Sequence, residues 1–82
     1  MSYREAIADQ VQAIADDAYA LARRRESRLV ALRVGLPSHV DETEFRALLG
    51  TRLGGLGLSD VEVEVEGVPG APRLVSAEFR PG

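Results

Sequence analysis

The six residues from Val61 to Glu66 alternate without a break between valine and glutamate, and this pattern constrains the fold more than any other segment. Successive side chains of a β-strand point to opposite faces, so the pattern predicts a strand with one apolar face and one charged face. A sheet with one apolar face has to bury that face against a second layer. The remainder of the chain is therefore expected to supply that layer.

Two further segments have the composition of strands. Residues 73–80 alternate again, and the predicted faces are formed by Val75, Ala77 and Phe79 on one side and by Leu74, Ser76 and Glu78 on the other. The turn-forming segment 67–72 precedes them, so we predict a β-hairpin in which the glutamates of the first strand face Arg73 or Arg80. Residues 28–35 form a short, nearly continuous apolar run, which predicts a central strand buried largely on both faces.

Two segments have the period of an amphipathic helix. Ser2 and Glu5 form a capping pattern, and the apolar positions that follow at three- and four-residue steps are Ile7, Val11, Ile14, Ala18 and Leu21. This helix is predicted to run to about Glu26, a length on the order of 36 Å, so part of it is expected to project or to be covered by a partner. Asp41 with Glu44 begins the second helix, which ends at the glycines of residues 54–57. Its predicted buried positions are Phe45, Leu48, Leu49 and Leu53.

The elements follow the order α-β-α-β-β, which predicts a single α+β domain over residues 1–82. Its architecture is a two-layer sandwich in which two helices pack on one face of a three-stranded sheet. A chain of 82 residues that is 45% hydrophobic and 28% charged has the composition of an ordinary globular domain. Because the chain contains no cysteine, disulfides, thiolate zinc sites and cysteine nucleophiles are all excluded.

The charges limit the classes of partner. The 13 acidic residues outnumber the 10 basic ones, all of which are arginine, and the net charge is −3. Nucleic-acid affinity rests mainly on neutralised phosphates, so an acidic chain is not expected to bind nucleic acid. No secretory signal and no membrane-spanning apolar stretch of about 20 residues is visible, so we expect a cytoplasmic protein without a membrane partner.

His39 is the only histidine, and three carboxylates lie near it in the sequence, those of Asp41, Glu42 and Glu44. A nickel or zinc site would need a second histidine or a thiolate, and a Ser38-His39-Asp41 triad is disfavoured because adjacent loop residues rarely align their side chains. We therefore predict no catalytic residue, no cofactor and no enzyme activity. A metal or small-ligand binder that uses the His39 loop is the alternative function. A subunit that completes an active site on another chain is a third hypothesis.

Two other patterns have a structural interpretation. Residues 54–57, Gly-Gly-Leu-Gly, follow a predicted helix and precede a strand, whereas a phosphate-binding loop follows a strand and opens a helix. They are therefore predicted to cap a helix. Glu62, Glu64 and Glu66 lie about 7 Å apart along a strand, too far apart to converge on a cation, and predict a solvated sheet face.

The order of elements, together with two stretches of sequence, resembles the HypA/HybF hydrogenase-maturation nickel metallochaperones. The first stretch is Arg28–Gly35 followed by Leu36–Phe45, which is similar to the family's V-x-x-V-x-L-x-x-G-E-L-S-x-V strand and a helix that begins D/P-E-x-L. The second is Val61–Glu66 followed by Gly67–Gly70, which is similar to an E-L-E-I-E strand that ends near V-P. The likeness extends over about residues 3–72 and implies the family's fold.

Two departures bear on what the resemblance implies for function. Met1-Ser2-Tyr3 stands where the family's nickel site has Met-His-Glu, and no C-x-x-C zinc motifs follow Val68-Pro69. The resemblance therefore implies a reduced relative that retains the protein-binding scaffold without the family's metal handling. It carries no catalytic or metal-binding residue over to this chain.

We predict a non-enzymatic accessory or assembly domain that binds another protein subunit or a second copy of itself. The resemblance implies a subunit or maturation factor linked to a metalloenzyme such as a hydrogenase. Tyrosine and arginine are over-represented at interface hot spots, so the exposed part of the first helix is the predicted contact surface. Its candidate residues are Tyr3, Tyr19, Arg23, Arg24 and Arg25. The last strand, if it lies at an edge of the sheet, offers a second surface by accepting a partner strand.

Overall fold

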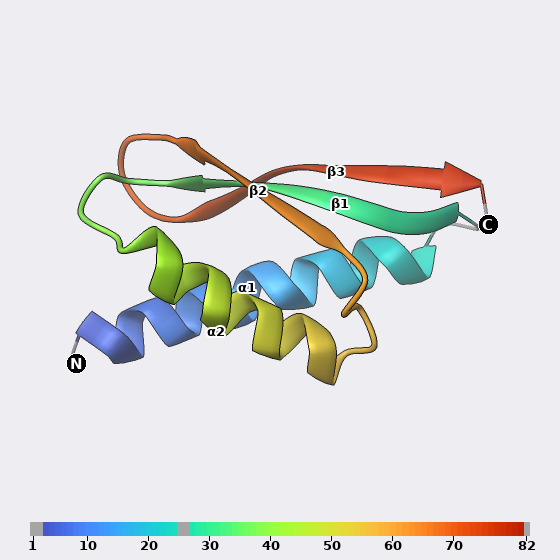
Figure 1. Ribbon diagram of the computed structural model, residues 1–82, viewed down its shortest axis with the longest axis horizontal. Helices are drawn as coiled ribbons and strands as arrows, with labels where there is room; N and C mark the ends of the chain where they lie inside the picture. Colours follow the sequence, from blue (N-terminus) through green and yellow to red (C-terminus); the bar gives the residue numbers. More distant parts are fainter. Residues whose placement is uncertain (1–2, 25–26, 82) are drawn as a thin grey trace.

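The chain folds into a sheet layer and a helix layer (Figure 1). The computed structural model describes residues 3–24 and 27–81, which form α1 (Tyr3–Arg24), β1 (Ser27–Leu36), α2 (Glu42–Gly55), β2 (Glu62–Gly67) and β3 (Arg73–Pro81). Both helices lie on the same face of the three-stranded sheet. The predicted α+β fold and its order of elements are therefore confirmed. The predicted cap residue Ser2 and the predicted helix end Glu26 lie outside the described residues.

β1 is the central strand, with β2 on one side and β3 on the other. β2 runs parallel to β1 after a crossover through α2, while β3 runs antiparallel to β1. The predicted central position of β1 is confirmed, but the predicted hairpin is wrong because β2 and β3 both pair with β1 and not with each other. Segment 67–72 carries the chain across the end of β1, where the backbone N–H of Val68 donates to the carbonyl of Leu36 at 3.1 Å.

Two register shifts interrupt the ladder between β1 and β3, one between Leu29 and Ala31 and one between Arg33 and Val34. Consecutive residues of β1, Arg33 and Val34, pair with Ser76 and Leu74, so Val75 is an extra residue in β3. Leu74 packs against the core, whereas Val75 is 43% exposed. The predicted faces of β3 are therefore wrong at Leu74 and Val75, because the bulge reverses the alternation at this point.

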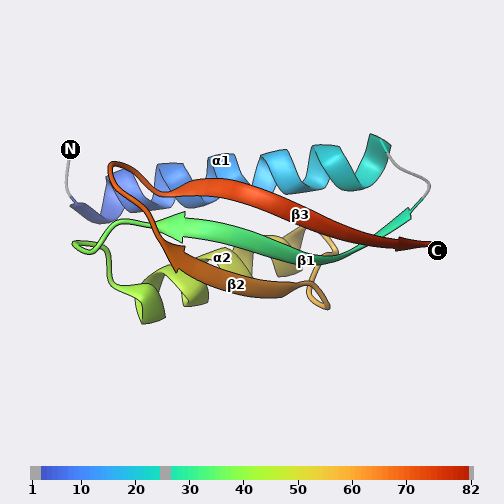
Figure 2. The ribbon, with the colours of Figure 1, turned by 90° about the horizontal axis from the view of Figure 1, so that it is seen from above.

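The core lies between the sheet and the two helices. The buried residues of the helices are Ile7, Val11, Ile14, Ala15 and Ala18 of α1 and Phe45, Leu49 and Leu53 of α2. Of the predicted buried positions, Leu21 and Leu48 are only half-buried. α1 runs along the length of β1 (Figure 2), and its packing continues to Ala22. The expected projection of α1 is therefore absent over residues 7–22, because a ten-residue strand at about 3.3 Å per residue matches a 22-residue helix at about 1.5 Å per residue.

Both ends of α2 follow from local signals in the sequence. The Asp41 Oδ1 atom accepts a hydrogen bond from the backbone N–H of Glu44 at 3.0 Å, as the predicted cap requires. At the other end, Gly57 has a φ of +77°, and the backbone N–H of Leu58 donates to the carbonyl of Leu53 at 2.8 Å. This bond after a left-handed glycine is the Schellman arrangement, so the predicted helix cap at residues 54–57 is confirmed.

Gly35 of β1 lies directly beside the side chain of Val68 in segment 67–72. A Cβ atom at this position would lie 2.6 Å from Cγ1 and 2.8 Å from Cγ2 of Val68, well inside the usual carbon–carbon contact of about 3.5 Å. The predicted burial of β1 on both faces holds at Gly35 and at Ala31, but it is wrong at Arg33, which is exposed. The small residue at position 35 therefore sets how closely the crossing segment approaches the sheet.

Replacing Gly35 by Ala is expected to destabilise the fold by about 1–3 kcal/mol, because the added methyl group overpacks the contact with Val68. Urea unfolding followed by circular dichroism measures this change in the free energy of unfolding. In the G35A/V68A double variant the second substitution removes the clashing methyl groups, so part of the loss should be regained. A G35A variant as stable as the wild type would contradict this explanation.

Candidate protein-binding surface

The loop that contains His39 forms the entry to α2, and His39 is exposed in it. The carboxylates predicted as its companions have other roles in the fold. Asp41 caps α2, and the Glu42 Oε2 atom accepts a hydrogen bond from Nε of Arg46 at 3.0 Å. Within residues 3–24 and 27–81, no three His, Cys, Asp or Glu side chains are grouped so as to hold a metal ion. In the described residues, His39 and these carboxylates thus form no group of three metal ligands.

A shallow hollow lies beside this loop, at the carboxyl ends of the parallel strands β1 and β2. Its volume is about 270 Å³, and its lining includes Pro37, Ser38, Glu42, Glu66 and Gly67. Small ligands of α/β proteins commonly bind at this end of parallel strands. The carboxylates of Glu42 and Glu66, however, make the hollow unfavourable for phosphate or carboxylate ligands.

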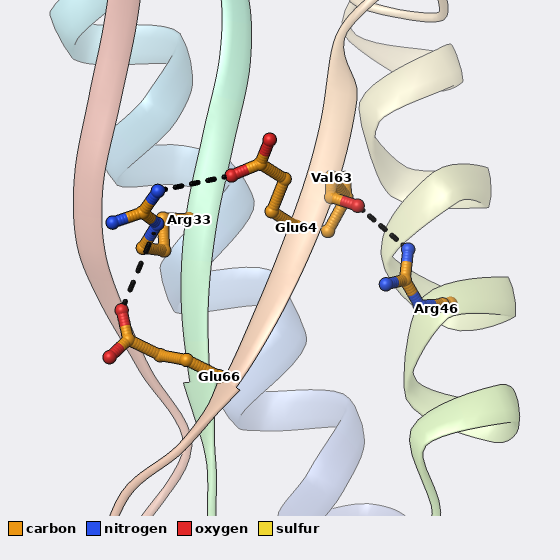
Figure 3. Close-up of polar contacts among 5 residues, drawn as sticks. All are labelled: Arg33, Arg46, Val63, Glu64 and Glu66. Atoms are coloured by element: carbon orange, nitrogen blue, oxygen red, sulfur yellow. Dashed lines mark hydrogen bonds and ion pairs between the residues drawn. The ribbon is translucent and has the colours of Figure 1, made fainter.

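The glutamates of β2 meet an arginine of β1 on the open face of the sheet (Figure 3). The Arg33 Nη2 atom lies 3.3 Å from Oε2 of Glu64, and its Nε atom lies 3.9 Å from Oε1 of Glu66. The predicted contact of these glutamates with Arg73 or Arg80 is wrong because β1, not β3, is the neighbour of β2. All three side chains are about half exposed, so each pair contributes at most about 1 kcal/mol to stability.

A second arginine, Arg46 of α2, donates a hydrogen bond to the free edge of β2. The Arg46 Nη1 atom donates to the carbonyl oxygen of Val63 at 2.7 Å, on the side of β2 that faces α2 and not β1 (Figure 3). The same guanidinium donates through Nε to Glu42, one turn earlier on α2. An edge carbonyl that already accepts a charged hydrogen bond is a poor acceptor for an added strand. α2 therefore protects this edge of the sheet.

The predicted contact residues that the structure describes lie on the last turns of α1. The Arg23 Nη1 atom donates to the hydroxyl of Tyr19 at 3.1 Å, and the guanidinium carbon lies 5.6 Å from the centre of the tyrosine ring. Tyr19 is half-buried, while Arg23 and Arg24 are exposed. Arg25 and the side chain of Tyr3 lie outside the described residues. Tyr19 and Arg23 thus form a pre-ordered aromatic–cation pair at the surface.

Further arginines lie at this end of the molecule, where α1 and β3 end and β1 begins. The C-terminus of α1, the start of β1 and the end of β3 lie together there (Figures 1 and 2). Arg28 of β1 and Arg80 of β3 are direct cross-strand partners, and both are exposed. We refer to the four described arginines of this region as the arginine end, which consists of Arg23, Arg24, Arg28 and Arg80.

The arginine end has little neutralising charge of its own. The Arg28 Nη2 atom lies 3.5 Å from Oδ2 of Asp60, but the two side chains are 63% and 84% exposed. Within the described parts of the chain, Arg24 and Arg80 take part in no ion pair. Sequence reasoning missed Arg28 and Arg80 because only the antiparallel pairing of β3 with β1 places them opposite each other, at the end of the molecule where α1 also ends. In the sequence, Arg28 is marked only by its place near the start of one predicted strand and Arg80 by its place near the end of another.

Comparisons with known proteins give no match: no family model matches the chain, and neither the curated proteins nor the solved structures contain a significant match. No helix in residues 3–24 or 27–81 is long and apolar enough to cross a membrane.

Replacing His39 by Ala is expected to leave the titration of the purified protein with Ni²⁺ or Zn²⁺ unchanged, since its nearby carboxylates already serve the cap and the Arg46 pair. Isothermal titration calorimetry on the two proteins makes the comparison. Loss of a stoichiometric binding step in the H39A variant would instead support a metal site in this loop.

Proposed function

We propose that this protein is a non-enzymatic accessory or assembly domain that binds an acidic surface of another protein subunit through its arginine end. The observation that carries the proposal is the placement of four exposed arginines from three elements at one end of the molecule: Arg23 and Arg24 at the end of α1, and the cross-strand partners Arg28 and Arg80. Arginine and tyrosine are the residues that dominate protein–protein hot spots, together with tryptophan. Guanidinium groups also bind carboxylates with two parallel hydrogen bonds, which favours aspartate or glutamate on the partner.

The charge distribution favours a protein over a nucleic acid as the partner. The chain has a net charge of −3, and the open face of the sheet carries the exposed carboxylates of Glu62, Glu64, Glu66 and Glu78. A nucleic acid that followed its phosphates beyond the arginine end would meet these carboxylates. A protein partner needs to match only the local arginine cluster, and the order already present in Arg23 lowers the conformational entropy lost on binding.

The resemblance to the HypA/HybF metallochaperones directs the proposal towards a metalloenzyme such as a hydrogenase. Two of the matching positions have a common physical role here, because the glycine at position 35 leaves the space that Val68 of the V-P stretch fills. Segment 67–72, after which that family carries its zinc domain, lies at the surface except for Pro72 and half-buried Val68. In this chain, β3 follows segment 67–72 directly and completes the sheet without an inserted domain. We propose that the chain serves assembly of such an enzyme without holding its metal.

The test is capture of a partner by the tagged protein from a lysate of its native host, followed by reconstitution with the purified partner. Reversing two charges, R23E/R24E, is expected to weaken binding at least tenfold, because two exposed cations of the arginine end are replaced by anions. Binding of the wild type should also weaken as salt is raised, since rim charges are screened within about 10 Å at 0.1 M. Calorimetry with the purified partner measures both effects.

The matched control is R52E, which reverses an exposed arginine near the end of α2. It should bind the partner as the wild type does. If R52E weakens binding as much as R23E/R24E, only the net charge matters and the arginine end is not the contact surface. If the protein captures nucleic acid in place of a protein, the proposed class of partner is wrong.

A further inference from the structure

The two edge strands of the sheet, β2 and β3, differ in length and in the hydrogen bonds that their outer backbone groups make. On the edge of β2, the carbonyl of Val63 already accepts a hydrogen bond from Arg46. The opposite edge is β3, which has β1 on one side and, within the described residues, no strand on the other. β3 is also three residues longer than β2, with nine residues against six. An edge strand of this length is a template for pairing with another strand.

Two features of β3 restrict which part of it can pair. The bulge at Val75 breaks the regular backbone pattern at one end, and Pro81 lacks a backbone N–H at the other. Residues 76–80 lie between them; the second register shift of the ladder, opposite Glu78 and Phe79, arises from an extra residue of β1, Val30, and inserts no residue into β3. Because the Leu36 carbonyl faces the β2 side, where it accepts from Val68, the alternation along β1 turns the backbone of Arg33 towards Ser76. The backbone of Ala77, the next residue of β3, therefore points to the free edge.

The charges of this stretch are complementary to themselves in one antiparallel register. If the two-fold axis passes at position 79, Glu78 of one copy lies opposite Arg80 of the other, and the reverse pair is identical. An axis at Glu78 or at Arg80 would instead place like charges opposite each other. An axis at Ala77 would pair Glu78 with Ser76. Only the register at position 79 forms two ion pairs.

The same register relieves a repulsion within the single chain. Arg80 lies directly opposite Arg28 across the β1–β3 ladder, and like charges in this position are unfavourable. Asp60 lies 3.5 Å from Arg28 but makes no ion pair with Arg80. A carboxylate supplied by a second copy on the other side of Arg80 would neutralise it. In the described residues of the single chain Arg80 has no ion-pair partner, and Glu78 of a second copy would provide one.

We propose that two copies of this chain form a symmetric dimer by antiparallel pairing of β3 with β3 around position 79, held in register by two Glu78–Arg80 ion pairs. The pairing continues the sheet from three strands to six. Because the paired stretch is short, the dimer is of the weak, concentration-dependent kind. Arg80 belongs to both this interface and the arginine end, but formation of the dimer requires only the chain itself and not the partner proposed above.

The test is sedimentation equilibrium of the purified protein over a range of concentrations, with charge variants of the two residues. Each single variant, E78R or R80E, places like charges opposite each other twice, so each is expected to raise the dissociation constant of its own dimer roughly tenfold. An equimolar mixture of the two variants has opposite charges at both contacts. The mixture should therefore recover dimer at the wild-type concentration, which a folding defect could not produce.

The matched control is E62R. Glu62 lies beside Ala31 on β2, as Glu78 does on β3, and both glutamates are exposed. The E62R and R23E/R24E variants should dimerise as the wild type does. A wild type that stays monomeric up to millimolar concentration overturns the proposal. So does a mixture of E78R and R80E that stays as monomeric as its components, or an E62R variant as impaired as E78R.

Discussion

Burial of β1 is the constraint on which the rest of the structure depends. Leu32 and Val34 are 1% and 0% exposed, because β1 is flanked by a strand on each side and covered by the helix layer. With β1 in the centre, the crossover through α2 places β2 on one side and leaves only the other side for β3. This arrangement brings the end of α1, the start of β1 and the end of β3 to one end of the molecule. The arginine end is therefore a consequence of the packing of one apolar strand.

The helices, strands and caps could be predicted because their signals are local in the sequence. The Asp41 cap, the glycine at 57 and the alternation of Val61–Glu66 each depend on a few neighbouring residues. Strand pairing could not be predicted in the same way, because alternation specifies the faces of a strand and not its neighbours. A hairpin was therefore predicted from the turn-rich segment 67–72. In the structure this segment instead crosses the end of β1 and connects the two strands on either side of it. The bulge at Val75 has no sequence signature that separates it from regular alternation.

The candidate surface shows the same division between local and long-range information. Tyr19, Arg23 and Arg24 share one helix, so their proximity follows from helical spacing. Arg28 and Arg80 are far apart in the sequence and meet only through the β1–β3 ladder. The predicted pairing of the β2 glutamates failed for the same reason, since their partner Arg33 belongs to the central strand. Local signals thus identify half of the arginine end, and the topology supplies the other half.

The central claim is that the arginine end is the surface that contacts another protein. Amide hydrogen exchange of the chain, alone and in complex with its captured partner, tests this claim most directly because it maps the contact without altering a residue. If the claim is right, protection on binding is concentrated in residues 19–24 of α1, at the start of β1 and at the end of β3. Protection confined to the His39 loop and the first turn of α2, at the opposite end of β1, would contradict it.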